Sequence, residues 1–180
     1  LSEFPTLTAL ANAPFPRVLR LWQGLGYNRR ARYLKNCAEI ITREHGGKIP
    51  KNSELLKKLP GIGHYTSGAV LCFAYGKCDP FLDTNIRRVF IHFFFKKSGG
   101  RVDDKTLLEC IAKNTPRPVT REWYFALMDY GREILGRKND NPNRKSKGYK
   151  KQTPFFGSQR QARSRIISYM LGKKTSVRTS

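Results

Sequence analysis

The sequence predicts an all-α protein. Apolar residues recur along most of the chain at the three- and four-residue spacing of one helix face. Short groups rich in glycine and proline separate these segments, as at Leu59–Pro60–Gly61 and Ser98–Gly99–Gly100. No segment of strand length shows the strict alternation of apolar and polar residues that is typical of a half-buried strand.

The helical segments can be followed in order from the N-terminus. Their apolar positions are Leu34, Cys37, Ala38 and Ile41; Ala69, Val70, Phe73 and Ala74; Ile86, Val89, Phe90, Phe93 and Phe94; and Tyr124, Leu127, Met128 and Gly131. A short helix is expected over about Ser53 to Lys58, and another begins near Tyr65. The aromatic run from Phe90 to Phe95 has the composition of a strand. It continues the phase of the preceding helix, so helix is predicted there too.

The composition indicates a folded protein that binds a polyanion. The 180 residues are 39% hydrophobic, which is typical of a globular chain. They carry 35 Lys+Arg against 13 Asp+Glu, a formal net charge of +22. Neutralising phosphates and releasing their counterions drives such proteins onto nucleic acid. An anionic membrane surface, or basicity without a partner, is the alternative.

The charge is concentrated after Leu135. Residues 137–180 hold 13 Lys/Arg and one acid, Asp140, so the tail contributes 13 − 1 = +12. We therefore expect a core over residues 1–136 and a basic tail over 137–180. The tail is expected to be an extended arm from Arg137 to Gly157, then a helix from Ser158 to about Leu171 with Ser158 as its N-cap. Residues 173–180 are expected to be disordered.

The cysteine pattern and the absence of export signals predict a cytoplasmic protein with free thiols. No apolar run approaches the roughly 18 residues of a membrane helix, and no signal peptide opens the sequence. Disulfides are therefore not expected. Cys37 and Cys72 lie on apolar helix faces, where a thiol behaves as a small hydrophobe. With Cys78 and Cys110 they form no C-x-x-C pair, so no metal site is predicted.

One segment has the composition of a phosphate-binding turn. In Leu59–Pro60–Gly61–Ile62–Gly63–His64–Tyr65–Thr66, a proline ends one helix, two glycines permit a tight turn and a second helix follows. Glycine lets backbone N–H groups approach an anion, and the helix N-terminus adds partial positive charge. An ordinary turn between two helices is the alternative.

The same segment carries a family resemblance. Leu59 to Phe90, with Phe81–Leu82–Asp83–Thr84–Asn85–Ile86–Arg87–Arg88–Val89, resembles the helix-hairpin-helix and Gly/Pro-Asp signature (HhH-GPD) of base-excision DNA glycosylases. The stretches Phe4 to Pro14, Leu21 to Tyr27, Arg30–Ala31–Arg32 and His45 to Pro50 resemble the adenine-specific MutY branch. The tail, with Asn141 to Arg144 and Phe156 to Gln161, is similar to a subgroup of that branch without an iron–sulfur cluster.

The resemblance implies a catalytic set of Asp83, Asn85 and Tyr65. Asp83 would stabilise the positive charge that develops on the deoxyribose, or attack its anomeric carbon, and Asn85 would orient it. A simple helix N-cap is the structural alternative for Asp83. Tyr65 stands where strand-cleaving relatives carry a Schiff-base lysine, so the resemblance implies a monofunctional enzyme. A buried core tyrosine is the alternative there.

The resemblance also implies a DNA-binding set. Leu25, Gly26 and Tyr27 would form a wedge in which Tyr27 intercalates, whereas Trp22 is expected in the core. Arg29 would reach a phosphate. Gly61, Ile62, Gly63, His64 and Thr66 would hold another phosphate at the hairpin. In relatives the hairpin binds a monovalent cation through backbone carbonyls, which here are those of Lys57, Leu59 and Ile62.

Three departures from the branch shape the functional prediction. The branch has a general-acid glutamate upstream of the segment that begins at Phe4, so we expect the chain to be N-terminally incomplete. No four-cysteine motif follows Asp83, and no iron–sulfur cluster is expected. No domain that reads 8-oxoguanine follows either. The prediction is a monomeric glycosylase acting on double-stranded DNA, which removes adenine opposite 8-oxoguanine or guanine. A thymine–guanine mismatch glycosylase and an inactive DNA-binding module are the alternatives.

Overall fold

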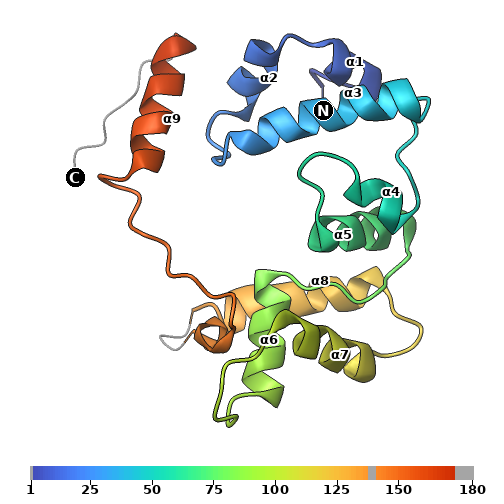
Figure 1. Ribbon diagram of the computed structural model, residues 1–180, viewed down its shortest axis with the longest axis vertical. Coiled ribbons are helices and arrows are strands. Elements are labelled where there is room, and N and C mark those ends of the chain that lie inside the picture. The colour runs from blue at the N-terminus through green and yellow to red at the C-terminus, as the bar shows by residue number, and fades with distance from the viewer. Residues whose placement is uncertain (1, 138–140, 173–180) are drawn as a thin grey trace. The chain divides into compact units, whose positions relative to one another are not determined.

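The computed structural model describes residues 2–137 and 141–172, and its regular structure is helical (Figure 1). The elements are α1 (Leu7–Asn12), α2 (Phe15–Trp22), α3 (Arg29–Glu44), α4 (Ser53–Lys57), α5 (His64–Tyr75), α6 (Thr84–Phe94), α7 (Asp104–Asn114), α8 (Arg121–Asp129), the π-helix η1 (Tyr130–Ile134), the 3-10 helix η2 (Pro142–Lys145) and α9 (Gln159–Met170). Within the described residues, extended pairing is limited to an isolated bridge between Val102 and Ser146. The all-α prediction is confirmed.

Local capping explains where several helices begin. The side chains of Thr6, Asp83, Asp103, Thr120 and Ser158 each accept a hydrogen bond from a backbone N–H in the first turn of the helix that follows. Those N–H groups have no partner inside the helix, and a cap is worth about 1 kcal/mol. The predicted helix after Ser158 is therefore found as α9.

The described residues divide into two compact units. The first lies within Leu1–Pro50, Lys58–Gly61 and Gln152–Ser180, and the second within Lys51–Lys57 and Ile62–Lys151. In the first unit, α1 and α2 pack against α3 (Figure 1) around the buried side chains of Leu10, Ala13, Val18 and Ala38.

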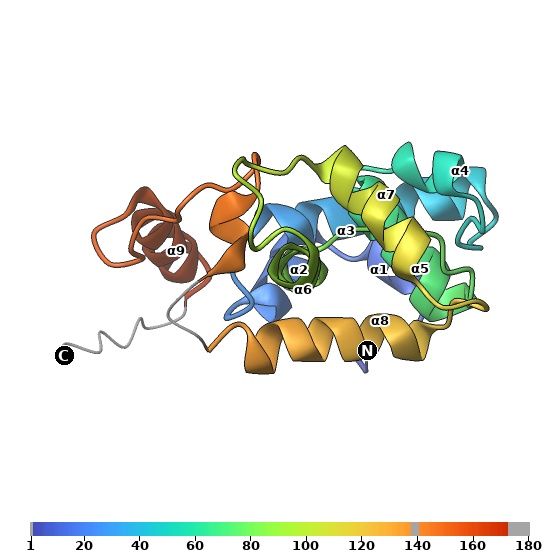
Figure 2. The same cartoon turned by 90° about the horizontal axis from the view of Figure 1, so that it is seen from below.

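The second unit has a larger core, centred on α6. In Figure 2, α6 is seen almost along its axis, with α7 and α8 on different sides of it. The fully buried side chains include Ile86 of α6, Leu107 and Ile111 of α7 and Tyr124 of α8. Burying an aliphatic side chain of this size stabilises the fold by roughly 1.5–3 kcal/mol. This core therefore gives the N-terminus of α6 a fixed support.

The prediction that all cysteines are free is wrong for two of them. Cys72, in the last turn of α5, forms a disulfide with Cys78. The helix ends at Tyr75, and its C-cap Gly76, with a left-handed φ of 68°, turns the chain back, so that the two Cα atoms lie 4.1 Å apart. Cys37 and Cys110 are free, and Cys37 is buried as expected.

The tail is also less extended than predicted. Residues 142–145 form η2, and Val102 N–H donates to the Lys145 carbonyl at 2.8 Å. The side chain of Asn143 donates to the Thr84 carbonyl at 3.0 Å. The first part of the tail thus packs on the second unit, because these polar groups find partners there, whereas α9 belongs to the first. The expected disorder at 173–180 concerns residues outside those described.

None of the helices within the described residues has the length and apolar character needed to cross a membrane.

Candidate active site

Asp83 is fixed at the N-terminus of α6 by its own helix. Its Oδ1 accepts hydrogen bonds from the backbone N–H groups of Asn85, at 2.9 Å, and Ile86, at 2.7 Å. Its Oδ2 has only a 3.5 Å contact with Nδ2 of Asn85. One carboxylate oxygen is therefore used to hold the side chain, and the other keeps lone pairs free for a substrate. The N-cap role is observed, and it leaves the predicted catalytic role open.

Tyr65 lies in the first turn of α5, and its environment includes Asp83. Partial burial is the main cause that raises the pKa of the Tyr65 phenol, and the negative charge of Asp83 raises it further. The phenol therefore stays protonated at neutral pH. The side chain is 41% exposed, so the alternative of a fully buried core tyrosine does not hold.

A glycine lets the segment before Asp83 approach α5 closely. A Cβ at Gly68 would lie 2.7 Å from the Cβ of Phe81, closer than two real side chains come. The Phe81 ring lies between Tyr65, at 6.0 Å, and Tyr124, at 4.2 Å between ring centroids. This packing brings Tyr65 and Asp83 into the same environment. No local pattern in the sequence distinguishes Gly68 from the other helical positions.

Asn85 is held from the other side by an arginine. Nη1 of Arg88 donates to Oδ1 of Asn85, at 3.2 Å, and to the Gly131 carbonyl, at 2.6 Å. Gly131 lies in η1, a π-helical turn of a kind often found at functional sites. The network from Asp83 to Gly131 ties the turn that carries Asp83 to the C-terminal end of α8. The sequence did not predict this role of Arg88, because the carbonyl that it contacts is 43 residues away. Gly131 itself was part of a predicted apolar helix face.

The hairpin turn is held by α3. Gly61 has a left-handed φ of 75°, and a Cβ there would lie 2.3 Å from the ring of Tyr33. The thiol of Cys37 also lies 3.2 Å from the carbonyl oxygen of Pro60. Both the backbone conformation and the contact therefore require glycine at position 61.

The start of α5 keeps its backbone donors available. Gly63 is the N-cap of α5, and no side chain caps the helix. His64 is exposed, and Ile62 and Thr66 are partly exposed. A helix N-terminus without a side-chain cap is suited to an anion. Phosphate binding by these residues remains a prediction.

The predicted wedge is an ordered turn in the first unit. Leu25 and Tyr27 expose 62% and 64% of their surface. Nε1 of Trp22 donates to the Gly26 carbonyl at 3.0 Å. The guanidinium of Arg30 lies over the rings of Trp22 and Tyr27 and donates to the Leu25 carbonyl. Trp22, expected in the core, is instead half-buried and braces this turn.

The predicted site residues therefore form separate groups. Asp83, Asn85 and Tyr65 lie together in the second unit. The wedge residues and the exposed Arg29 lie in the first unit.

Comparison with known proteins identifies the family of this chain. Residues 1–113 match the family described as HhH-GPD superfamily base excision DNA repair protein. An adenine DNA glycosylase of Mycobacterium tuberculosis is 32% identical, in an alignment covering 93% of this chain and 61% of the relative. A thymine/uracil-DNA glycosylase of Pyrobaculum aerophilum is 33% identical over 77% of this chain and 63% of the relative. The solved structure of a thermostable thymine-DNA glycosylase is similar, with a TM-score of 0.65 and 25% identity over 81% of this chain and 68% of that one.

The chain thus spans about three fifths of the length of these two relatives.

Proposed function

Because the chain belongs to the HhH-GPD superfamily of base excision DNA repair proteins, we propose that it is a DNA glycosylase. It hydrolyses the N-glycosidic bond of a mispaired base, which is adenine opposite 8-oxoguanine or guanine. The observation that carries the proposal is the geometry of Asp83, whose Oδ1 is held by two backbone N–H groups while Oδ2 keeps lone pairs free.

The chemistry uses that free oxygen. When the bond from the sugar to the base breaks, its electrons leave with the base and positive charge develops on the deoxyribose. A fixed carboxylate stabilises this charge without having to reorganise at that moment. Oδ2 of Asp83 either pairs with the cationic sugar or forms a transient bond to its anomeric carbon. Water then adds to that carbon, which breaks any bond to Asp83, and the proton that the water loses is taken up by the departed base. The products are the neutral free base and an abasic site.

Tyr65 supports a monofunctional reaction. A phenol cannot form the Schiff base through which a lysine would cleave the strand. Because burial and the Asp83 charge raise its pKa, the phenol is a hydrogen-bond donor at neutral pH. The abasic product is therefore expected to stay intact until alkali is added.

We propose that the protein binds double-stranded DNA as a monomer. We expect it to occur in the compartment that contains this DNA. The net charge of +22 supplies attraction that is independent of sequence. Exposed Tyr27 supplies a ring that can insert into the base stack, and unstacking costs a few kcal/mol. The N–H groups of the hairpin and Arg29 supply phosphate contacts.

We also propose that no iron–sulfur cluster takes part. Cys72 and Cys78 are joined to each other, Cys37 is buried in α3, and Cys110 lies in α7. We propose instead that a monovalent cation binds at the hairpin through backbone carbonyls, as the family resemblance implies. The carbonyls that would hold it are those of Lys57, Leu59 and Ile62. The cation would orient the hairpin toward a phosphate.

A thymine–guanine mismatch is the second candidate substrate. The thymine/uracil relative and the thymine-DNA glycosylase structure favour it. Adenine is preferred because the similarity to the adenine relative extends over 93% of this chain, against 77% for the thymine/uracil relative.

The test is single-turnover cleavage of end-labelled duplexes that contain A opposite 8-oxoguanine, A opposite G, or T opposite G, each with and without hot alkali. We expect alkali-dependent cleavage at adenine. Cleavage only at T opposite G would transfer the assignment to thymine. Cleavage without alkali would refute the monofunctional mechanism, and DNA binding without cleavage of any duplex would mean an inactive binding module.

A pair of variants tests the role of Asp83. Asp83→Asn should slow base release by at least about 10²-fold, the order of effect seen when one preorganised group is removed. Asp79→Asn removes the same charge from the same loop, where the side chain is exposed and the contact with Tyr124 uses the main chain. Equal rates for the two variants would show that the carboxylate has been assigned wrongly.

A further inference from the structure

The first unit contains a groove that the family signature does not account for. It has a volume of about 730 Å³. One wall is formed by the wedge turn and the start of α3, and the other wall is formed by one face of α9. Tyr27, Arg29 and Arg30 line one wall, and Arg160 and Arg163 line the other. We call these five residues and the space between them the arginine groove. Its α9 wall lies outside residues 1–113, which match the family.

The positive charge of the arginine groove is not neutralised within the first unit. The three acids of that unit, Glu3, Glu39 and Glu44, pair with Arg17, Lys35 and Arg43. The groove arginines form no ion pair with the described residues. Four guanidinium groups in one open groove are therefore available to bind an external anion.

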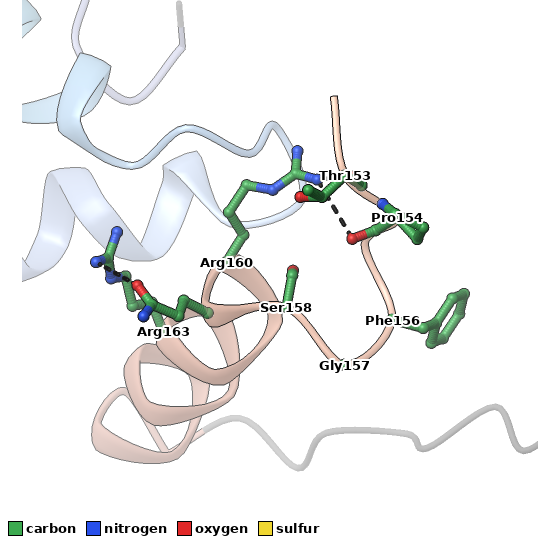
Figure 3. A pocket seen from close by; sticks show the side chains of 8 residues that line it. Thr153, Pro154, Phe156, Gly157, Ser158, Arg160 and Arg163 are labelled. Carbon is green, nitrogen blue, oxygen red and sulfur yellow. Dashed lines mark hydrogen bonds between the residues drawn. The ribbon is translucent and has the colours of Figure 1, made fainter. Parts of the chain in front are cut away.

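The hydrogen bonds of these arginines position them without neutralising them. Arg160 donates to the main-chain carbonyls of Thr153 and Pro154, and Arg163 donates to Oε1 of Gln159 (Figure 3). The side chain of Arg30 donates to main-chain carbonyls of the wedge turn, and the side chain of Arg29 forms no hydrogen bond with the described residues. Each partner is uncharged. The planar donor forks thus remain able to bind phosphate oxygens.

The two walls are joined at the wedge. Nε2 of Gln152 donates to the hydroxyl oxygen of Tyr27 at 2.5 Å, and Oγ of Ser168 donates to Oε1 of Gln23 at 3.4 Å. These contacts link the tail to the turn that carries Tyr27 from two places. The groove is therefore adjacent to the residue expected to enter the base stack.

We propose that the arginine groove binds the sugar–phosphate backbone of the DNA strand next to the point where Tyr27 inserts. This proposal rests on the proposed function for the kind of partner, but it adds a second phosphate-binding site, distinct from the hairpin. Arginines that bind phosphates contribute affinity that is independent of sequence and falls with salt. The groove thus anchors the wedge on the duplex and does not select the base.

Two arginines of α9 make a matched test. Arg163 lines the groove, whereas Arg165 is exposed on the same helix and does not line it. Replacing either by alanine removes one charge and keeps a residue of high helix propensity. Binding to an undamaged labelled duplex is measured by fluorescence anisotropy over a range of salt concentrations, with the helix content of each variant checked by circular dichroism.

For Arg163→Ala, the slope of log K against log salt should become shallower by about 0.9, which is one released counterion on duplex DNA. Arg165→Ala should change the slope by less than half of that. Equal changes for the two variants, or none for Arg163→Ala, would overturn the groove as a phosphate site.

The result is separable from the outcome for the proposed function, because binding is read on DNA from which no base is released. A specific effect of Arg163 without base release on any mismatch would refute the enzyme and keep the groove. Base release from a mismatch, together with equal salt slopes for the two variants, would keep the enzyme and refute the groove. Failure of the unmodified chain to bind duplex DNA would refute both.

Discussion

Nη1 of Arg88 donates to the carbonyl oxygen of Gly131 at a distance of 2.6 Å, which joins α6 to the π-helical turn after α8. The same nitrogen donates to Oδ1 of Asn85, whose own backbone N–H holds Asp83. The position of the proposed catalytic carboxylate thus depends on a contact between two distant parts of the second unit. The two segments pack so closely that this contact requires a residue without a side chain at position 131.

Gly131→Ala should damage both stability and catalysis. The added Cβ would lie 2.4 Å from the backbone oxygen of Asn85, so the turn that carries Asp83 has to move. Overpacking of this kind costs about 1–3 kcal/mol of unfolding free energy. Base release in single turnover should fall about tenfold or more, as expected when a reacting group is displaced. Gly99→Ala is the control, because a Cβ there meets no atom within 4 Å. Unchanged base release by a folded Gly131→Ala protein would remove Gly131 from the positioning network.

Gly61→Ala should weaken DNA binding through the hairpin. The residue has φ of 75° and touches the Tyr33 ring, so alanine is both strained and overpacked. We expect an unfolding free energy lower by about 1–3 kcal/mol and a higher Kd for duplex DNA. Urea unfolding and anisotropy measure the two effects. Gly46→Ala shares the left-handed φ, at 57°, but has open space around it. If Gly46→Ala weakened DNA binding as much as Gly61→Ala does, the loss of affinity would be due to backbone strain in general and not to the hairpin.

Asp103 should contribute stability that is lost in acid. Hydrogen bonds from the backbone and hydroxyl of Thr106 and from Lys147 lower its pKa from 3.8 to about 2. Because the folded-state pKa is depressed, the contribution is complete above about pH 4 and disappears as the pH falls to about 2. Asp103→Asn should therefore lower the unfolding free energy at pH 5 and differ little from the unmodified protein near pH 2. Urea unfolding at both values tests this. If the difference in unfolding free energy between the two proteins grew toward low pH, the lowered pKa of Asp103 would be contradicted.

The disulfide should stabilise the end of α5. In oxidising buffer, Cys78→Ser is expected to lower the unfolding free energy by about 2 kcal/mol, the order predicted for closing so short a loop. In excess dithiothreitol the variant and the unmodified protein should unfold at similar urea concentrations. Cys110→Ser is the control, since that thiol is free and only partly buried. If mass spectrometry under denaturing conditions found four reactive thiols before reduction, the pairing would be refuted.

The sequence by itself determined the helical fold and the ends of the helices that matter for the site. Asp83 caps α6 and Ser158 caps α9 through groups two or three residues away, so these signals are local and visible in the chain. The two glycines of the hairpin were visible for the same reason, because a left-handed or exposed turn has a local cause.

Tertiary structure alone decided how the turn that carries Asp83 is supported. Gly68 meets Phe81, and Arg88 meets Gly131, through contacts between segments that are distant along the chain. The arginine groove likewise needs the tail to return to the wedge, where Gln152 reaches Tyr27 across 125 residues. Periodicity and capping report the interactions of a residue with its own helix. They carry no information about which distant backbone carbonyl or ring will occupy the space beside it, and that is settled only when the core packs.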